Sequence, residues 1–119
     1  MIVLRIPEAS PSLNEFSFSH WRKQHTLKKK WLAMLTSAAI AAKATKATGK
    51  RKLTIERYGL RRLDPDNIVG GAKGCIIDNL RALSLLVDDH DDAVELSARN
   101  MARAKGEKPY TNIILQDIE

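Results

Sequence analysis

The chain has 119 residues, of which 44% are hydrophobic, and its 20 Lys and Arg against 14 Asp and Glu give a formal net charge of +6. A chain of this length buries roughly two-thirds of its unfolded surface, enough for one hydrophobic core, so we expect a single domain over residues 1–119. No apolar run approaches the length of a membrane span, and the N-terminal sequence MIVLRIPEAS lacks the charged start and long apolar region of a signal peptide. We therefore expect a cytoplasmic protein.

Hydrophobic periodicity predicts an α+β fold in which a mixed β-sheet carries two helices, in the order βαβαββ. A β-branched run over 2–6 predicts a first strand, and the Ser-, Pro- and Asn-rich segment after it predicts a loop. Apolar residues at helical spacing predict a helix from about Thr26, with Gly49 as a stop signal. The remaining elements are a strand over 52–58, a helix with Asp66 as its N-cap, and strands over 93–101 and 111–118.

Carboxylates gather on either side of the second predicted helix. Asp64 and Asp66 lie two residues apart at a strand-to-helix junction, so in an extended stretch both side chains leave on the same side and can share one ion. Asp88 and Asp89 follow the same helix. Hard cations such as Mg²⁺ and Mn²⁺ take carboxylate oxygens and bridge to substrate phosphates. The pattern favours a site that holds a divalent cation and handles phosphate.

The charges around these carboxylates are segregated. Residues 64–95 hold eight of the 14 acidic side chains and two basic ones, a formal charge of −6, so the rest of the chain sums to +12. From Phe16 to Ile55 there are ten Lys or Arg and no acid. Basic flanks around an acidic centre suit a polyanion that the flanks hold and the centre attacks. The alternative is an acidic loop neutralised by lysines of the same protein, but the spacing favours function.

Further residues of the second predicted helix could belong to the same site. Lys73 lies seven residues after Asp66, close to two helical turns, so it projects from nearly the same side and can reach the same phosphate. Asp78 falls on the flank of that face, as a metal ligand, a group that supports one, or a solvated acid. His90 could act as a base or a ligand, although a histidine in an acidic turn is more often only exposed.

Three glycines interrupt this helix, and each costs about 1 kcal/mol relative to alanine in a helix interior. They are Gly70, Gly71 and Gly74. Two explanations are open: a backbone or a ligand comes close to the helix there, or the helix packs tightly against a neighbouring helix or subunit. The single cysteine, Cys75, has no partner for a disulfide or a CxxC zinc site and is expected to be a small core residue.

Basic residues supply a candidate phosphate-binding surface. Lysines of the first predicted helix either form a solvated face or contact phosphates, and no acid of the same helix compensates them. Arg61 and Arg62 precede the first carboxylates. Three aromatic residues, Phe16, Phe18 and Trp21, interleave with Arg22 and Lys23. This pattern is compatible with stacking on unpaired bases, although aromatic residues at a helix start are more often part of the core. The lysines in question are Lys28, Lys29, Lys30, Lys43 and Lys46.

Taken together, these residues resemble the RusA-type Holliday junction resolvases, a family of small endodeoxyribonucleases common in phages and prophages. The resemblance rests on Asp64-x-Asp66-Asn67, a lysine and then an aspartate in the next helix, the pair Asp88-Asp89, and an N-terminal Pro11-Ser12-x-Asn14 similar to a loop of the family. It covers essentially the whole chain, including its length and the order of its elements.

The resemblance implies a homodimer that incises branched DNA, such as a four-way junction, with Mg²⁺ or Mn²⁺, in recombination and repair within a bacterial cell. Asp64, Asp66 and Asp89 match the family's catalytic aspartates, and Lys73 its helix lysine. Asp78 and Asp88 would support the metal, and Asn14 would contact DNA.

Two positions depart from the family pattern. The family lysine often stands four residues after the second aspartate, where this chain has Gly70, and an arginine often precedes the first aspartate, where it has Leu63. The positions four and seven residues after Asp66 lie on the same side of a helix, so Lys73 can still take the role of the family lysine. Arg61 or Arg62 can take the role of the missing arginine.

The function we expect is therefore that of a metal-dependent, structure-specific endodeoxyribonuclease. Two other classes compete with it. A catalytically silent DNA-binding module would use its acids only to steer or mimic phosphate. A nucleotide phosphohydrolase is disfavoured, because the chain has no Walker loop and its basic surface exceeds what a small substrate needs.

Overall fold

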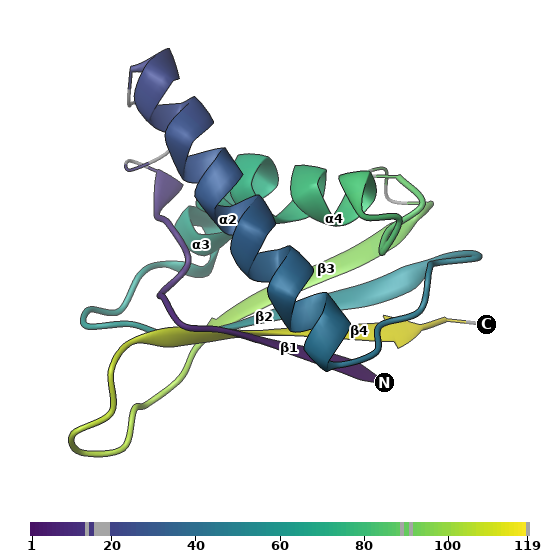
Figure 1. Cartoon of the computed structure of the whole chain (residues 1–119). Helices are drawn as coiled ribbons and strands as arrows, with labels where there is room; N and C mark the ends of the chain where they lie inside the picture. Colours follow the sequence, from purple (N-terminus) through teal and green to yellow (C-terminus); the bar gives the residue numbers. More distant parts are fainter. Residues whose placement is uncertain (14, 16–19, 89, 91, 119) are drawn as a thin grey trace.

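The computed structural model describes residues 1–13, 15, 20–88, 90 and 92–118. Within them the chain forms, in order, β1 (Ile2–Ile6), α2 (Trp21–Ala41), β2 (Arg51–Tyr58), α3 (Pro65–Ala72), the π-helix η1 (Lys73–Ile77), α4 (Asp78–Ala82), β3 (Val94–Asn100) and β4 (Tyr110–Asp117). The segments α3, η1 and α4 are consecutive parts of one helical stretch (Figure 1). The predicted α+β fold, a mixed sheet with two helices in the order βαβαββ, is confirmed.

The four strands form one sheet in the order β1-β4-β2-β3. Strand β4 pairs antiparallel with β1 and with β2, whereas β2 and β3 are parallel. Helix α2 lies along β1, and α3 lies along β3, so both helical stretches cover the same face of the sheet (Figure 1). The parallel pair makes the crossover β2-α3-β3, which places the N-terminus of α3 near the C-terminal ends of β2 and β3.

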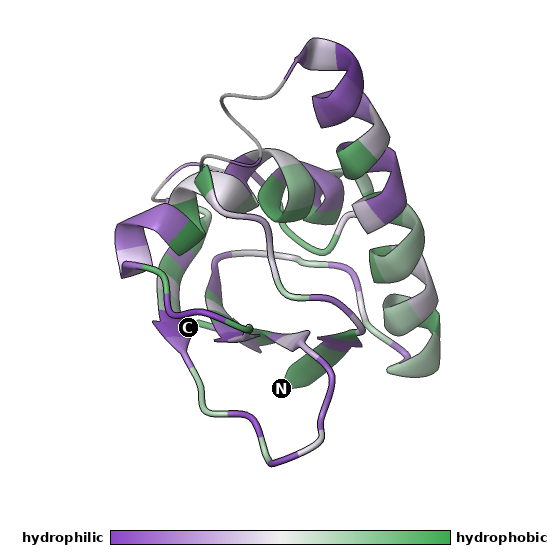
Figure 2. Ribbon diagram, turned by 90° about the vertical axis from the view of Figure 1, so that its left-hand side faces the viewer, coloured by the Kyte–Doolittle hydropathy of each residue, from purple (hydrophilic) through white to green (hydrophobic). Residues whose placement is uncertain are grey.

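The hydrophobic core fills the space between the helices and the sheet. Alternate strand residues such as Leu4, Leu53 and Ile113 are fully buried and face Trp31 and Leu35 of α2. Helix α2 is apolar toward its C-terminal end and hydrophilic toward its N-terminal end, which projects beyond the sheet (Figures 1 and 2). The described helices include none that is long and apolar enough to span a membrane.

The first helix begins and ends earlier than predicted, since the prediction placed its start near Thr26 and its stop at Gly49. It begins at Trp21 and ends at Ala41, with Lys43 in the left-handed conformation (φ 53°). The N–H of Ala44 donates to the carbonyl of Ala39, and that of Lys43 to Ile40, which is a Schellman motif. A lysine occupies the position that glycine usually takes, so no local sequence pattern indicated where the helix ends. Lys43 and the later Lys46 therefore lie in the loop after α2.

The second helical stretch contains an unexpected π-helix. In η1 the N–H of Asp78 donates to the carbonyl of Lys73, five residues back instead of four. The extra residue per turn lets a run of consecutive residues, from Gly74 to Ile77, be buried together. It also turns every later residue of the helix, Asp78 included, relative to α3.

The lone cysteine is a core residue, as predicted. Cys75 is fully buried, and this burial raises the pKa of its thiol from 9.0 to about 12. The unfolded chain loses this proton near pH 9 and the folded chain only near pH 12. Stability present below pH 9 is therefore lost as pH rises toward 12, by up to about 1.4 kcal/mol per pH unit.

Chemical denaturation of the wild type and of Cys75→Ala between pH 8 and 11 tests this expectation. The free energy of unfolding should fall more steeply with pH in the wild type, because the alanine variant lacks the titrating thiol. Parallel pH dependences in the two proteins would contradict it.

Candidate metal and DNA-binding site

Asp64 and Asp66 both lie at the N-terminal end of α3. Asp64 is the N-cap, and its carbonyl accepts hydrogen bonds from the N–H groups of Asn67 (2.9 Å) and Ile68 (3.1 Å). The prediction of Asp66 as N-cap is wrong, because Pro65 takes the first helical position, where its fixed φ and missing N–H are tolerated. Within the described residues the carboxylate of Asp64 makes no capping hydrogen bond. Two exposed carboxylates thus stand at the positive end of one helix.

The end of β3 fixes the backbone just before these carboxylates. The side-chain oxygen of Asn100 accepts the N–H of Leu63 at 3.0 Å, and its side-chain nitrogen donates to the carbonyl of Leu63. Both backbone groups of the residue that precedes Asp64 are therefore held by a single amide. Sequence reasoning missed Asn100, because the two residues are 37 positions apart and no local pattern connects them.

The N-terminal loop packs directly on α3. The N–H of Leu13 donates to the side-chain oxygen of Asn67 at 2.8 Å. A Cβ added at Gly71 would come within 2.0 Å of the carbonyl oxygen of Pro11, and one added at Gly70 within 2.8 Å of the Leu13 side chain. Of the two explanations for these glycines, the close approach of a backbone accounts for Gly71. Residues 11–13, the described part of the segment that resembles the family's N-terminal loop, are thereby attached to α3.

We expect Gly71→Ala to displace this loop and to destabilise the fold by roughly 1–3 kcal/mol, as overpacking of a close contact does. Gly49→Ala is the matched control, since a Cβ at Gly49 meets no atom within 4 Å. Thermal or chemical denaturation measures both variants. Equal stability of the Gly71 and Gly49 variants would show that the loop is not held against the helix.

A buried arginine supports the basic turn before Asp64. The Nε of Arg57 donates to the carbonyl of Ser10 (2.9 Å), and its Nη1 donates to the carbonyl of Arg61 (2.8 Å). Burial lowers the pKa of Arg57, and Arg61 adds to this effect while Glu15 opposes it. Its position in the inward-facing register of β2, after Leu53 and Ile55, was the sequence signal for an inward-pointing arginine.

A cavity of about 440 Å³ opens beside this turn. Its wall includes the basic side chains of Arg57 and Arg61, the acidic side chain of Glu15 and the motif residue Asn67. Arg61 and Arg62 are exposed, as a role in binding phosphates requires. Other residues that line the cavity are Ser12, Glu15, Leu60 and Leu63.

Two other predicted metal ligands, Asp78 and Asp88, lie toward the opposite end of the helical stretch. Asp78 follows Asp66 by 12 residues, about 18 Å along a helix axis at 1.5 Å per residue. A carboxylate oxygen of Asp78 lies 3.4 Å from the Nζ of Lys28 and another 3.9 Å from Arg81, and Arg81 in turn lies 3.6 Å from Asp88. Asp88 also lies 3.6 Å from the Nε2 of His90. One ion-pair chain thus holds Asp78 and Asp88 together, away from Asp64.

No group of three or more His, Cys, Asp or Glu side chains able to hold a metal ion occurs among the described residues. Asp89 and Asn14 lie outside them, so their predicted roles as metal ligand and DNA contact stay predictions. Asp64 and Asp66 supply two exposed carboxylates, a donor set that fits a hard cation with several waters still bound.

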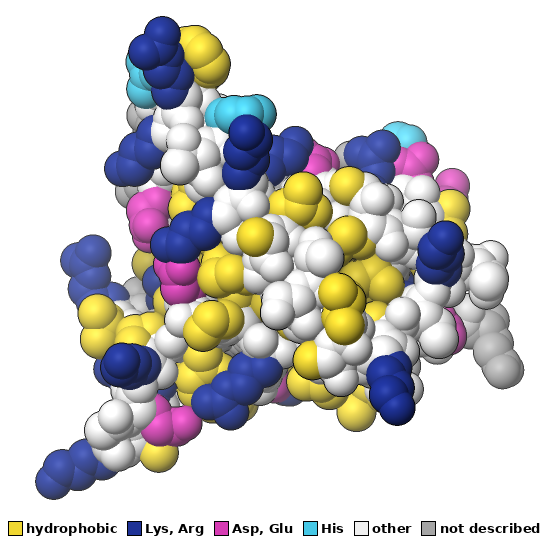
Figure 3. Space-filling view, in the orientation of Figure 1, with side chains coloured by type: hydrophobic (Ala, Val, Ile, Leu, Met, Phe, Trp, Pro, Cys, Tyr) yellow, Lys and Arg dark blue, Asp and Glu magenta, His cyan; other side chains and the backbone are white. Residues whose placement is uncertain are grey.

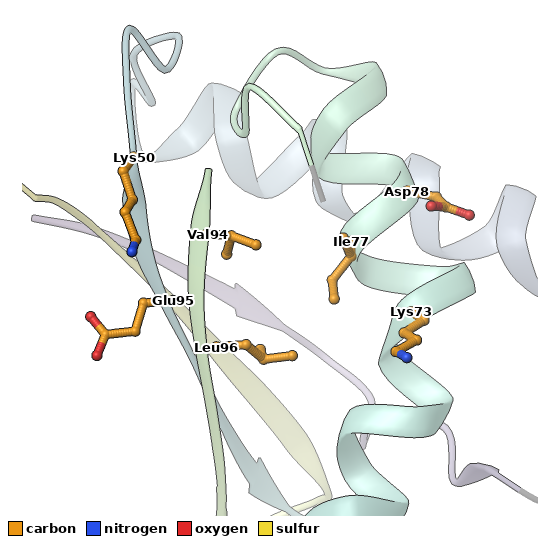
Figure 4. Close-up of a pocket in the computed structure, with 7 residues that line it drawn as sticks. All are labelled: Lys50, Lys73, Ile77, Asp78, Val94, Glu95 and Leu96. Carbon is orange, nitrogen blue, oxygen red and sulfur yellow. The ribbon is translucent and has the colours of Figure 1, made fainter. Parts of the chain in front are cut away.

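Lys73 is exposed and lines a cavity of about 490 Å³ between the helical stretch and β3 (Figure 4). It lies about 10 Å along the helix axis from Asp66 at 1.5 Å per residue. Neither Asp64 nor Asp66 belongs to the described residues on the cavity wall. Its neighbours there are Lys50, Ile77, Asp78, Val94, Glu95 and Leu96. The shared approach of Lys73 and Asp66 to one phosphate stays a prediction.

The lysines of α2 are partly compensated by acids of other elements. Lys28 pairs with Asp78 at 3.4 Å and Lys30 with Glu8 at 2.7 Å, whereas Lys29 has no ion pair among the described residues. Basic side chains line the projecting N-terminal half of α2, with acidic ones beside them (Figure 3). Such exposed pairs contribute little to stability, so phosphates can displace the acids at small cost.

Trp21 stands at the tip of this projection. Its side chain is 64% exposed, so the alternative of a core residue is wrong for Trp21. Phe16 and Phe18 lie outside the described residues. The guanidinium of Arg22 lies 5.3 Å from the centre of its ring system, and the ring of His20 lies 5.6 Å away. An exposed aromatic ring next to basic side chains is suited to stacking on an unpaired base.

Comparison with known proteins does not assign the chain to a family. No family model matches the chain, and no curated protein matches its sequence at a significant level. The resemblance to RusA-type resolvases therefore rests on the motif residues of the sequence.

Proposed function

We propose that the chain is a Mg²⁺-dependent, structure-specific endodeoxyribonuclease that resolves four-way junctions or related branched DNA. The observation that carries this proposal is the N-terminus of α3. There the Asp64 and Asp66 carboxylates are exposed, a preceding arginine pair is exposed beside them, and Asn100 and the N-terminal loop fix the backbone. This arrangement combines hard-cation ligands with phosphate-binding groups on a rigid support.

In this mechanism Asp64 and Asp66 would hold one or two Mg²⁺ ions, with Asp89 as a further ligand. When bound, Mg²⁺ supplies an activated water and neutralises the charge that develops on the scissile phosphate. Arg61 and Arg62 hold the phosphate backbone next to the break. Lys73 adds a positive charge at the phosphate in the transition state, where a fixed charge is worth more than in the ground state.

The proposal is tested by incubating the purified chain with a labelled four-way junction and with a linear duplex of the same arm sequences. Incision of the junction in Mg²⁺, and not in a chelator, is expected, with the duplex left intact. A catalytically silent DNA-binding module would shift the junction in a native gel and leave every strand whole.

We further propose that binding depends on phosphate contacts and reads branched shape instead of base sequence. Its basic groups are Lys28, Lys29, Lys30, Lys43, Lys46, Arg61 and Arg62. Several of them are exposed on the projecting end of α2 or in the loop after it. No helix-turn-helix or zinc-finger pattern that would read base edges occurs in the sequence.

Affinity for the junction should therefore fall by about 0.9 log units per log unit of salt for each phosphate neutralised, and junctions of unrelated arm sequence should bind alike. Titrations in a Ca²⁺ buffer, between 50 and 300 mM salt, measure both. Lys29→Ala should reduce the slope of log affinity against log salt by about 0.9, the contribution of one phosphate contact. Lys105→Ala, in the exposed loop before β4, is the control and should leave the slope unchanged. A salt-independent affinity would show that the basic helix is only solvated.

A homodimer is the proposed assembly. A four-way junction has two strands to be cut symmetrically, whereas each chain carries one pair of exposed motif carboxylates. A two-fold pair of chains would present two such sites in the symmetry of the substrate.

A further inference from the structure

Arg57 keeps part of its guanidinium unused beside the cavity of about 440 Å³. The residue is only 8% exposed and lies on the cavity wall. Its Nε and Nη1 donate to the carbonyls of Ser10 and Arg61, whereas its Nη2 has no acceptor in the described part of the chain. The fully enclosed side-chain atoms without a partner do not include this Nη2, so it is open to solvent. A guanidinium carries five N–H donors, and those of Nη2 remain for a ligand.

Gly59 makes room for this guanidinium. A Cβ added at Gly59 would come within 2.1 Å of the Nη1 and 2.7 Å of the Cζ of Arg57. The backbone of Gly59 does not lie in the left-handed region, so the position requires the missing side chain and not a special conformation. The guanidinium is thus held between two backbone carbonyls and a glycine, in a fixed place on the wall.

The polar part of the wall offers hydrogen-bond donors and a net positive charge. Arg57 and Arg61 contribute two positive charges there, and Glu15 contributes one negative charge. Arg61 helps to lower the pKa of Arg57, so the two guanidinium groups are close enough to repel. The side-chain oxygen of Asn67 accepts the N–H of Leu13, which leaves the side-chain N–H donors of Asn67 for another partner. An anion between the guanidinium groups would relieve their repulsion and accept from these donors.

The rest of the wall is apolar. Leu60 is 76% exposed, so its side chain offers apolar surface that a ligand can cover. A volume of about 440 Å³ suits a small-molecule ligand and is too small for a duplex. A ligand with an anionic group and a flat apolar body fits this division of the wall. The apolar residues are Ala9, Leu60, Leu63 and Pro109.

We propose that this cavity binds a single nucleotide. The phosphate lies between the guanidinium groups of Arg57 and Arg61, whose planar arrays of donors match phosphate oxygens. The base lies against the apolar side chains of Leu60 and Leu63. Two sources can supply this chemistry: a free nucleotide, or an unpaired nucleotide of a DNA strand.

The cavity adjoins the candidate metal site, and its role in a DNA strand rests on the proposed nuclease function. Leu63 on the wall directly precedes Asp64, and the N–H of Asn67 donates to the carbonyl of Asp64 at 2.9 Å. A nucleotide in the cavity therefore lies next to the proposed metal ligands. In branched DNA it would be an unpaired nucleotide beside the scissile phosphate, since a base must leave its stack to enter a pocket of this size.

Titration followed by backbone amide NMR signals, in the presence of a chelator, tests the binding. Thymidine 5′-monophosphate should shift the amides of residues 59–63 and 67. Thymidine lacks the phosphate and 2-deoxyribose 5-phosphate lacks the base, so each should bind at least about tenfold more weakly.

Variants of the wall test the two guanidinium groups. Arg61→Gln should weaken binding of thymidine 5′-monophosphate at least about tenfold. The exposed position of Arg61 leaves the fold intact, and the backbone carbonyl still accepts from Arg57. Arg57→Gln should have the same effect, whereas Lys52→Gln, an exposed position on the same strand, should bind normally. Unshifted wall amides, equal affinity for 2-deoxyribose 5-phosphate, or normal binding by Arg61→Gln would overturn the proposal.

Competition identifies the source of the nucleotide. If it belongs to a DNA strand, a short oligothymidylate should displace thymidine 5′-monophosphate from the same amides. The mononucleotide should then also raise the KM for a four-way junction and leave kcat unchanged. An oligothymidylate that leaves the mononucleotide in place would assign the cavity to a free nucleotide. If the wild type cuts no DNA at all, the nuclease function fails, and the titration in chelator still decides nucleotide binding.

Discussion

Replacing Asp66 by asparagine should abolish incision of a four-way junction, with a loss of at least about three orders of magnitude in the single-turnover rate. The amide keeps the size of the side chain and removes the negative charge that holds a hard cation. Binding to the junction in Ca²⁺ should be unchanged or slightly tighter, because a carboxylate that repels phosphate is lost. Rate and affinity are measured on the same labelled junction.

Glu107→Gln is the matched control for this variant. Glu107 lies in the loop before β4, and a glutamine there can still accept the N–H of Ala104. Its incision rate should equal that of the wild type. Full Mg²⁺-dependent activity of Asp66→Asn would remove Asp66 from the metal site and with it the central part of the proposed mechanism.

Lys73→Ala should lower the incision rate by roughly one to three orders of magnitude while affinity for the junction changes much less. A fixed positive charge that acts mainly in the transition state affects the rate more than binding. Lys105→Ala removes an exposed lysine from a loop and should leave the rate unaltered. If Lys73→Ala weakened binding alone, Lys73 would be a DNA-binding residue, and the cavity beside β3 would be part of the DNA path.

Local patterns located the elements well where the responsible residues are adjacent in sequence. The run Ile2–Ile6 coincides with β1, and the other three strands agree within about one residue of their predicted ends. The Asp64 N-cap was also available from the sequence, since proline at the first helical position favours a cap one residue earlier.

Features that depend on distant contacts could not be found in this way. The stop of α2 uses Lys43 in a conformation that usually requires glycine. The π-helix arises where consecutive residues are all buried, which is a property of the packed core and not of the sequence KGCII. The hydrogen bonds of Asn100 to Leu63 depend on the crossover that brings β3 beside the start of α3.

The separation of the carboxylates was partly predictable. A helix between Asp66 and Asp88 must hold its two ends apart by about 1.5 Å per residue. One site that contains both ends is therefore difficult to build within a single chain.

The position of the metal tests the central claim most directly. For a chain of 13.3 kDa, backbone amide signals can be followed by NMR during titration with Mn²⁺, whose unpaired electrons broaden signals of nearby nuclei. We predict that the amides of residues 63–68 lose intensity first, at Mn²⁺ well below one equivalent, and that Asp66→Asn removes this effect. Loss of intensity that spares residues 63–68, or that persists there in Asp66→Asn, would contradict the account.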